Sequence, residues 1–285
     1  MNDFINFFTL EGLLKIILQM DLFDSITDTL SINLFSPSGK FGPILALIRT
    51  LYNTVFPIAV MLLFVFFLIS MVDKCSSENF TWEQLWRLFA MLLATKFLIE
   101  HGFDLLDKMF QIGLSIMNSF SAVRGPSSEF ALTDAEIEEI ITTLNESMNW
   151  AIKIVRNILL WIALLIPALI SWIMKVAVAV ICYSRVVEIY TRAVFTPAAL
   201  ADVFHGGLQS GGWRYLKSFF AICLQGAAII VIAVIYGQLM AILAQNYAAS
   251  REFWSYYCIS IAIQTSAIML MFKSLNLTKE ILGVA

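Results

Sequence analysis

The sequence has few charged residues for its length. Of its 285 residues, 14% are charged and 60% are hydrophobic. A soluble domain carries about 25% charged and about 45–50% apolar residues. A fold of this size cannot hide such a surplus of apolar surface from water, whereas a lipid bilayer can solvate it. The composition therefore predicts an integral membrane protein.

The residue types that form catalytic and metal sites are also scarce. The chain has two histidines, His101 and His205, which lie far apart, and its four cysteines show no CxxC spacing. The glycine patterns of nucleotide-binding loops, the HExxH zinc motif and the nucleophile elbow are absent. The net charge of -3 gives no basic footprint for nucleic acid. We therefore expect no catalytic residue, no metal ion and no cofactor, and hence no enzyme.

Long hydrophobic runs are present instead, and they define the expected domain organisation. A bilayer core about 30 Å thick needs a helix of about 20 residues. We expect an all-α transmembrane helical bundle over residues 51–285, preceded by an extracytoplasmic N-terminal segment, 1–50, of amphipathic helix. The expected spans are 55–72, 85–120, 150–174, 216–244 and 253–272, with six or seven crossings as the alternative to five. Pro57 lies near the start of the first span, where a helix tolerates proline best.

Two of these assignments leave alternatives open. The N-terminal segment is either a helix lying on a membrane surface or on a partner, or a packed cap on the bundle. The apolar region from Trp150 to Phe195 is either one crossing that continues as a helix to residue 195, or a helical hairpin that turns at Pro167.

Residues 85–123 differ from the other spans because polar side chains recur along them. On a single helix these side chains project into an arc of about 140°. Lys96–Glu100 and Asp104–Lys108 have the i,i+4 spacing that pairs opposite charges. Charges inside a membrane usually face a partner subunit or a water-filled path. The candidates for a channel lining or subunit interface are Lys96, Glu100, Asp104, Asp107, Lys108 and Gln111; structural ion pairs on a helix leaving the membrane are the equal alternative.

A glycine-rich break, residues 196–214, separates two long helical stretches. Glycine permits backbone conformations that other residues rarely adopt. The segment is therefore either a hinge or docking loop or a plain turn between helices. Its candidate residues are Pro197, Gly206, Gly207, Gly211, Gly212, Trp213 and Arg214.

The distribution of lysine and arginine predicts the orientation. Basic residues flank the glycine-rich break and occur in the C-terminal tail, whereas the 124–147 loop has Arg124 alone. The positive-inside rule then places the N-terminus outside and the C-terminus in the cytoplasm. Arg49, just before the first span, argues mildly against this orientation.

The segment TPAALADVFHGGLQSGGWRYLKSFFA resembles part of a known family. A proline-containing stretch and then a glycine-tryptophan pair open a span in the TrbL/VirB-six family of channel subunits of type IV secretion and conjugation machines. The chain is most similar to the branch on conjugative elements of Gram-positive bacteria. The matching residues are Pro197, Ala199, Leu200, Ala201, Gly212 and Trp213, within a resemblance that covers about residues 150–275.

The resemblance implies a non-enzymatic, multi-pass subunit of the bacterial cytoplasmic membrane that helps DNA cross as nucleoprotein. It also implies a homo-oligomeric ring, other conjugation-machine subunits as partners, and an ATPase on a separate chain. A secondary transporter or permease subunit is the alternative function, although the two halves of the chain show no clear internal repeat. A small toxin-like or immunity membrane protein is a third class, which the several long spans do not favour.

Overall fold

The computed structural model describes residue 26 and residues 29–76, 81–122, 150–250 and 253–283. Every regular element among them is a helix. The elements are α4 (Gly42–Cys75), α5 (Trp82–Glu100), α6 (Gly102–Ala122), α8 (Trp150–Ala201), α9 (Val203–Gly206), the 3-10 helix η2 (Gly207–Gln209), α10 (Gly211–Ser250) and α11 (Phe253–Ile281). Most of the expected N-terminal amphipathic segment and all of the acidic 124–147 loop lie outside the described residues.

Four helices in the described part of the chain are long and apolar enough to cross a membrane. They cover Gly42–Cys75, Ala168–His205, Gly211–Met240 and Cys258–Ile281. The predicted fold class, an all-α polytopic helical bundle, is therefore confirmed. The fifth expected span, 85–120, coincides with α5 and α6, and its crossing stays a prediction. Helix α5 is not among the four helices because it carries too many acidic and basic residues for a candidate span.

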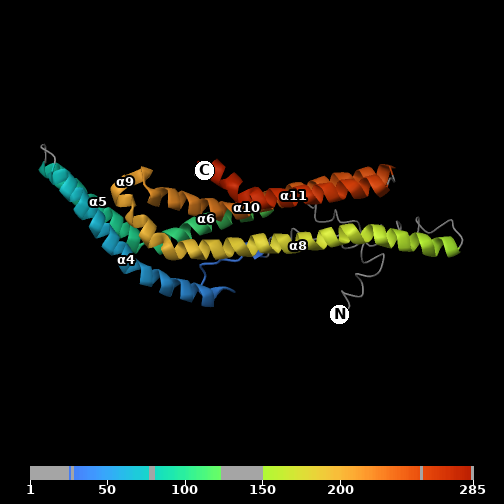
Figure 1. Cartoon of the computed structure of the whole chain (residues 1–285), viewed down its shortest axis with the longest axis horizontal. Helices are drawn as coiled ribbons and strands as arrows, with labels where there is room; N and C mark the ends of the chain where they lie inside the picture. The colour runs from blue at the N-terminus through green and yellow to red at the C-terminus, as the bar shows by residue number, and fades with distance from the viewer. Residues whose placement is uncertain (1–25, 27–28, 77–80, 123–149, 251–252, 284–285) are drawn as a thin grey trace. The chain divides into compact units, whose positions relative to one another are not determined.

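Helix α4 begins earlier than the sequence indicated. It starts at Gly42, with proline at its first positions, and runs for 34 residues, so Pro57 lies deep inside it. The prediction that Pro57 is near a helix start is wrong, because residues 42–54 extend the helix upstream of the apolar run. A proline within a helix removes one ladder hydrogen bond and commonly bends the helix. Figure 1 shows α4 changing direction along its length.

Helix α8 settles the choice left open for the region around Pro167. It is continuous over 52 residues and contains both Pro167 and Pro197. A helical hairpin at Pro167 is therefore wrong. A bilayer core needs only about 20 residues, so α8 is longer than one crossing requires. The stretch that is long and apolar enough to cross is Ala168–His205, downstream of the expected 150–174, and a crossing at 150–174 stays a prediction.

The polar stretch 85–123 is two helices, not one long helix. Helix α5 ends at Glu100, and its C-cap residue His101 has φ -97 and ψ 10, outside the helical region. Helix α6 begins at Gly102, and the two helices leave this break in different directions (Figure 1). A single continuous stripe from Lys96 to Asn118, which the helical period predicted, is therefore interrupted.

The chain divides into two compact units. The first comprises 1–30, 119–182 and 228–273, and the second comprises 31–118, 183–227 and 274–285. In the described part of the first unit, Ser260 and Gln264 of α11 are fully buried, and Gln264 hydrogen-bonds Tyr236 of α10. The second unit contains α4, α5, α6, α9 and the adjoining parts of α8, α10 and α11, and it holds every candidate site residue.

Candidate interface surface on α5 and α6

The polar candidates of α5 and α6 lie on the outside of the second unit. We call Lys96, Glu100, Asp104, Asp107, Lys108 and Gln111 the α5–α6 polar surface; Asp107 is half-buried, and the other five are exposed. The Lys96 Nζ lies 3.5 Å from a Glu100 carboxylate oxygen, which confirms the pair that the spacing predicted. The Lys96 and Glu100 side chains are 54% and 44% exposed, so the pair is not a buried structural bridge.

The second predicted ion pair is wrong. Among the ion pairs of the described residues, Asp104 is joined to His101, with 3.8 Å between its Oδ2 and the His101 Nδ1, and not to Lys108. The break at His101 brings the imidazole within reach of the first turn of α6. One turn further on, the Gln111 amide nitrogen donates to both carboxylate oxygens of Asp107 at 3.0 Å. Because Asp104 and Asp107 are engaged by His101 and Gln111, the ammonium group of Lys108 can bind a group outside the described chain.

The opposite side of α6 fixes this surface to the bundle. Its buried residues include Leu106, Phe110, Gly113 and Met117, which follow the helical repeat. At Gly113 the backbone approaches α10 so closely that a Cβ atom would lie 2.8 Å from the Cys223 carbonyl oxygen. Only glycine allows this approach, and it turns the polar side of α6 outward.

Arg185 of α8 is buried, although it is one of the basic residues that flank the glycine-rich break in the sequence. It is 3% exposed, and its Nε and Nη2 donate to the carbonyl oxygens of Ile222 and Cys223 on α10, both at 3.1 Å. The guanidinium lies 6.0 Å from the centre of the Phe110 ring of α6. A Cβ at Gly226 would meet three guanidinium atoms at 2.7–2.9 Å. Arg185 thus joins α8, α10 and α6 at one point, and Gly226 provides its space.

An aromatic cluster packs around the start of α6. The Tyr52 hydroxyl of α4 donates to the Ile99 carbonyl at 3.0 Å, and the Tyr52 ring meets Phe103 edge-on at 5.4 Å. The Arg49 guanidinium lies 5.1 Å from the centre of the Phe103 ring. Phe35 contacts both Phe103 and Phe110. These contacts place the break between α5 and α6 against the first half of α4.

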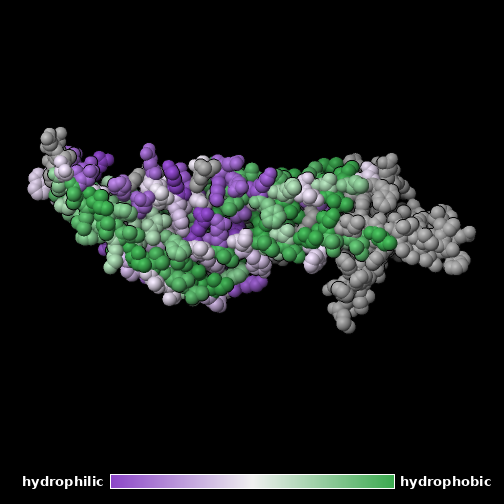
Figure 2. Space-filling model, viewed as in Figure 1, coloured by the Kyte–Doolittle hydropathy of each residue, from purple (hydrophilic) through white to green (hydrophobic). Residues whose placement is uncertain are grey.

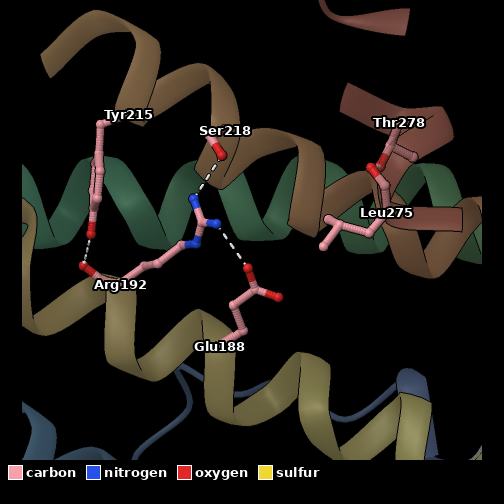
Figure 3. A network of polar contacts seen from close by, with 6 residues as sticks. All are labelled: Glu188, Arg192, Tyr215, Ser218, Leu275 and Thr278. Atoms are coloured by element: carbon pink, nitrogen blue, oxygen red, sulfur yellow. Dashed lines mark hydrogen bonds and ion pairs between the residues drawn. The ribbon is translucent and has the colours of Figure 1, made fainter. Parts of the chain in front are cut away.

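A half-buried polar network joins α8 to α10 (Figure 3). The Arg192 guanidinium bonds the Glu188 carboxylate at 2.8 Å and the Ser218 hydroxyl at 2.7 Å, and the Tyr215 hydroxyl donates to the Arg192 carbonyl. Arg185 and Arg192 are therefore engaged within the protein. The exposed basic residues next to the glycine-rich break are Arg214 and Lys217.

The glycine-rich break is a closely bonded turn in which α9 and η2 connect α8 to α10. Gly207 has φ +54, a conformation that favours glycine. The Ser210 hydroxyl donates to the Gly207 carbonyl at 2.7 Å and accepts from the Trp213 N–H at 3.2 Å, which caps α10. At Gly212, whose N–H donates to Asp202, a Cβ would lie 2.3 Å from the Ala199 carbonyl oxygen.

The other residues predicted for this segment fall in or beside helices. Pro197 is buried within α8, and Gly206 ends α9. Gly211 opens α10, where Trp213 is half-buried and Arg214 is exposed. Gly207, Gly211 and Gly212 each serve a specific turn or close contact, which is the geometry of a fixed connection. A hinge or docking role for the segment stays a prediction.

The surface of the second unit is apolar on α4 and polar around α6. Large exposed side chains of α4 include Met61 at 71% and Val72 at 68%, and Trp82 and Trp86 of α5 are 77% and 72% exposed. Figure 2 shows hydrophobic side chains over much of α4 and hydrophilic ones between α8 and the first part of α10. Among the described residues, no group of His, Cys, Asp and Glu is placed to hold a metal ion.

One comparison with known proteins gives a match. A family model described as TrbL/VirB6 plasmid conjugal transfer like protein matches residues 26–197, which is more than half of the chain. No curated protein and no solved structure matches. The matched range differs from the one that carried the resemblance in the sequence: it includes α4, α5 and α6 and ends at Pro197, before the glycine-tryptophan pair.

Proposed function

Because the chain belongs to the TrbL/VirB6-like plasmid conjugal transfer family, we propose that it is a non-enzymatic channel or scaffold subunit of a type IV secretion-like conjugation machine. Membership of the family implies a component of the conjugal transfer machinery that works with other subunits of that machinery. Four apolar helices make it a multi-pass membrane protein. We place it in the bacterial cytoplasmic membrane, where several copies form a ring that helps DNA cross as nucleoprotein, driven by an ATPase on another chain.

The observation that carries this proposal is the position of the exposed charges beside apolar helices. Helix α4 has no charged residue between Arg49 and Asp73, a run of 23 residues that is long enough to cross a bilayer. Tyr52, in this run, bonds Ile99, which lies between Lys96 and Glu100 along α5. The exposed pair therefore lies alongside the apolar run of α4.

The polar side of α6 has a similar position relative to α10. After Lys217, α10 carries no charged residue up to its end, and Gly113 packs on Cys223 within this run. Gln111, two residues before Gly113, is exposed. A charged side chain at the bilayer centre costs about 2.5–3.5 kcal/mol even on the scales that give the lowest values. The exposed charged and amide groups beside these apolar runs therefore favour a protein neighbour or water over lipid.

The charges of the surface favour a neighbouring subunit over DNA as its occupant. Three carboxylates, those of Glu100, Asp104 and Asp107, stand against two lysines. A surface that holds DNA phosphates is rich in lysine and arginine, because the affinity comes from neutralising the phosphates. Mixed charges instead suit contact around the axis of the ring, where this surface of each copy faces its neighbours and each lysine can meet a carboxylate of another copy. We assign the α5–α6 polar surface to contact between copies.

Cysteine cross-linking in membranes tests this assignment. In a chain whose exposed Cys75 and Cys258 are replaced by serine, Gln111→Cys on α6 is expected to form a covalent dimer with a short bifunctional maleimide. Met61→Cys, which is 71% exposed on the apolar side of α4, is the matched control and should stay monomeric. Equal cross-linking at both positions, or none at Gln111→Cys, would contradict the assignment.

Charge reversal tests the role in transfer. Lys96→Glu and Glu100→Lys, made singly, are expected to lower the frequency of plasmid transfer between cells by at least tenfold while the protein remains in the membrane. The double variant restores the opposite charges of the 3.5 Å pair and should recover part of the loss. Transfer at the wild-type frequency in both single variants would show that this surface has no role in transfer.

A further inference from the structure

The break between α5 and α6 contains a side chain from another helix. In a continuous α-helix the Phe103 N–H would donate to the Ile99 carbonyl, four residues earlier. Here the Tyr52 hydroxyl of α4 stands between them, because it donates to the Ile99 carbonyl at 3.0 Å and hydrogen-bonds the Phe103 N–H. Insertion of a side chain into the helical ladder is one of the known causes of a sharp kink.

The ladder is intact on either side of this insertion. The His101 N–H donates to the Phe97 carbonyl at 3.0 Å, and the Leu105 N–H donates to the His101 carbonyl at 2.9 Å. Between these two bonds, the described backbone has none of the three ladder bonds that the N–H groups of residues 102–104 would make to residues 98–100, and Tyr52 occupies the middle one. If the hydroxyl is withdrawn, the Phe103 N–H and the Ile99 carbonyl can bond each other, and the ladder bonds on either side can close with them.

Gly102 provides the space for the hydroxyl. A Cβ at this position would lie 2.8 Å from the Tyr52 oxygen and 3.0 Å from the Leu200 Cδ1. Any larger residue would push the hydroxyl away from the break. Tyr52 and Gly102 therefore form a matched pair, although they are far apart in sequence.

Tyr52 also lies on a part of α4 that can move relative to the rest. Pro57 has no N–H to donate to the Asn53 carbonyl, so the ladder of α4 is interrupted one residue after Tyr52. Beyond Pro57, Phe67 packs on Phe89 of α5 with ring centres 5.3 Å apart, which holds that half of α4 to α5. A change in the bend at Pro57 would move Tyr52 along α5 without moving the Phe67 contact.

We propose that the segment between α5 and α6 is a two-state hinge and that insertion of the Tyr52 hydroxyl holds it in the bent state. With the hydroxyl inserted, the two helices are bent as in Figure 1; with it withdrawn, the bond from Phe103 to Ile99 closes and residues 82–122 become one helix. The straight state aligns Lys96, Asp104 and Gln111 in one polar stripe, whereas the bent state divides it at His101. This inference concerns contacts within the chain and stands whether or not the stripe contacts a second copy.

The distance between spin labels on α5 and α6 tests the hinge. Labels on Leu93→Cys and Ile112→Cys, both on exposed residues, are measured by pulsed electron resonance in lipid nanodiscs. The exposed Cys75 and Cys258 are replaced by serine, and the buried Cys182 and Cys223 stay. One continuous helix would separate the two backbone positions by about 28 Å, at 1.5 Å per residue, and the bent state gives a shorter distance.

Tyr52→Phe is the decisive variant, because it removes the hydroxyl and keeps the ring that packs on Phe103. The label distance is expected to shift from the shorter value toward about 28 Å. Tyr236→Phe is the matched control: it removes another buried hydroxyl, which bonds Gln264 within the first unit, and should leave the distance unchanged. An unchanged distance in Tyr52→Phe, or an equal shift in Tyr236→Phe, overturns the proposal.

Gly102→Ala tests the same role of the hydroxyl without altering Tyr52. Its methyl group displaces the hydroxyl, so the distance should lengthen as it does in Tyr52→Phe. If the protein with Gly102→Ala keeps the wild-type distance, the hydroxyl does not control the bend and the proposal fails.

Discussion

The contact between α6 and α10 at Gly113 provides a prediction in which two glycine variants have opposite signs. Gly113→Ala would place a methyl carbon 2.8 Å from the Cys223 carbonyl oxygen and 3.0 Å from the Cys223 Cβ. These are atoms of a helix backbone and its first side-chain carbon, so they cannot rotate away. Gly237 is also inside a helix, α10, but a Cβ there would meet no described heavy atom within 4 Å.

The expected magnitudes follow from two opposing effects. Replacing glycine by alanine inside a helix stabilises it by about 0.5–1 kcal/mol, because the unfolded chain loses conformational freedom. Overpacking a close contact costs about 1–3 kcal/mol. Gly237→Ala gains the first term alone, whereas Gly113→Ala has both and should lose roughly 1 kcal/mol. At about 2–4 °C per kcal/mol, Gly113→Ala lowers Tm by about 3 °C and Gly237→Ala raises it by about 2 °C.

Thermal unfolding of the purified protein in one mild detergent measures both values. Helix content followed by circular dichroism reports the transition, and gel filtration before heating shows that each variant is folded and monodisperse. Because the two substitutions are chemically identical, their difference isolates the contact with Cys223. An equal Tm for the two variants would refute the close approach of α6 to α10.

Three further outcomes are expected from other contacts. Arg185→Met loses two charge-assisted hydrogen bonds to Ile222 and Cys223, at about 1.5 kcal/mol or more each, and should lower Tm by at least about 6 °C; the exposed Arg214→Met should shift it by less than about 2 °C. Ser210→Ala removes the cap of α10 and should cost about 1 kcal/mol by the same measurement, whereas Ser266→Ala on the exposed side of α11 should be nearly neutral; equal losses would argue against the cap. The predicted topology places the exposed Cys75 in the cytoplasm, so a membrane-impermeant maleimide should label it only after the cells are permeabilised; labelling of intact cells would reverse the orientation.

The sequence predicted the class of fold well and its bends poorly. Composition and run length suffice for a membrane bundle, since the need for about 20 apolar residues does not depend on packing. The spacing of Lys96 and Glu100 predicted their pair, because residues four apart share a helical face. Asp104 has the same spacing to Lys108, yet it contacts His101. That pairing depends on the break at His101, which a contact with α4 accompanies.

The residues that hold the second unit together could not be recognised from their own surroundings in the sequence. Arg185 has the appearance of a basic residue near a membrane boundary, and only its position against α10 shows that it is buried. Gly113 and Gly226 have no local motif; each is required by a neighbour from a distant helix. The glycines at 206–212 did stand out, but the sequence did not show that Ser210 and Asp202 hold the turn by hydrogen bonds.

The sequence by itself determined that this chain is a helical membrane protein, that it lacks the motifs of an enzyme, and that one polar segment is unlike its other spans. Hydropathy and helical periodicity are properties of consecutive residues, so these features need no tertiary information. The tertiary structure decided where the polar segment bends, which of its charges are exposed, and which glycines and buried polar groups hold it in place. Those features arise from contacts such as Tyr52 with Ile99 and Gly113 with Cys223, whose partners are separated by tens of residues and meet only when the helices pack.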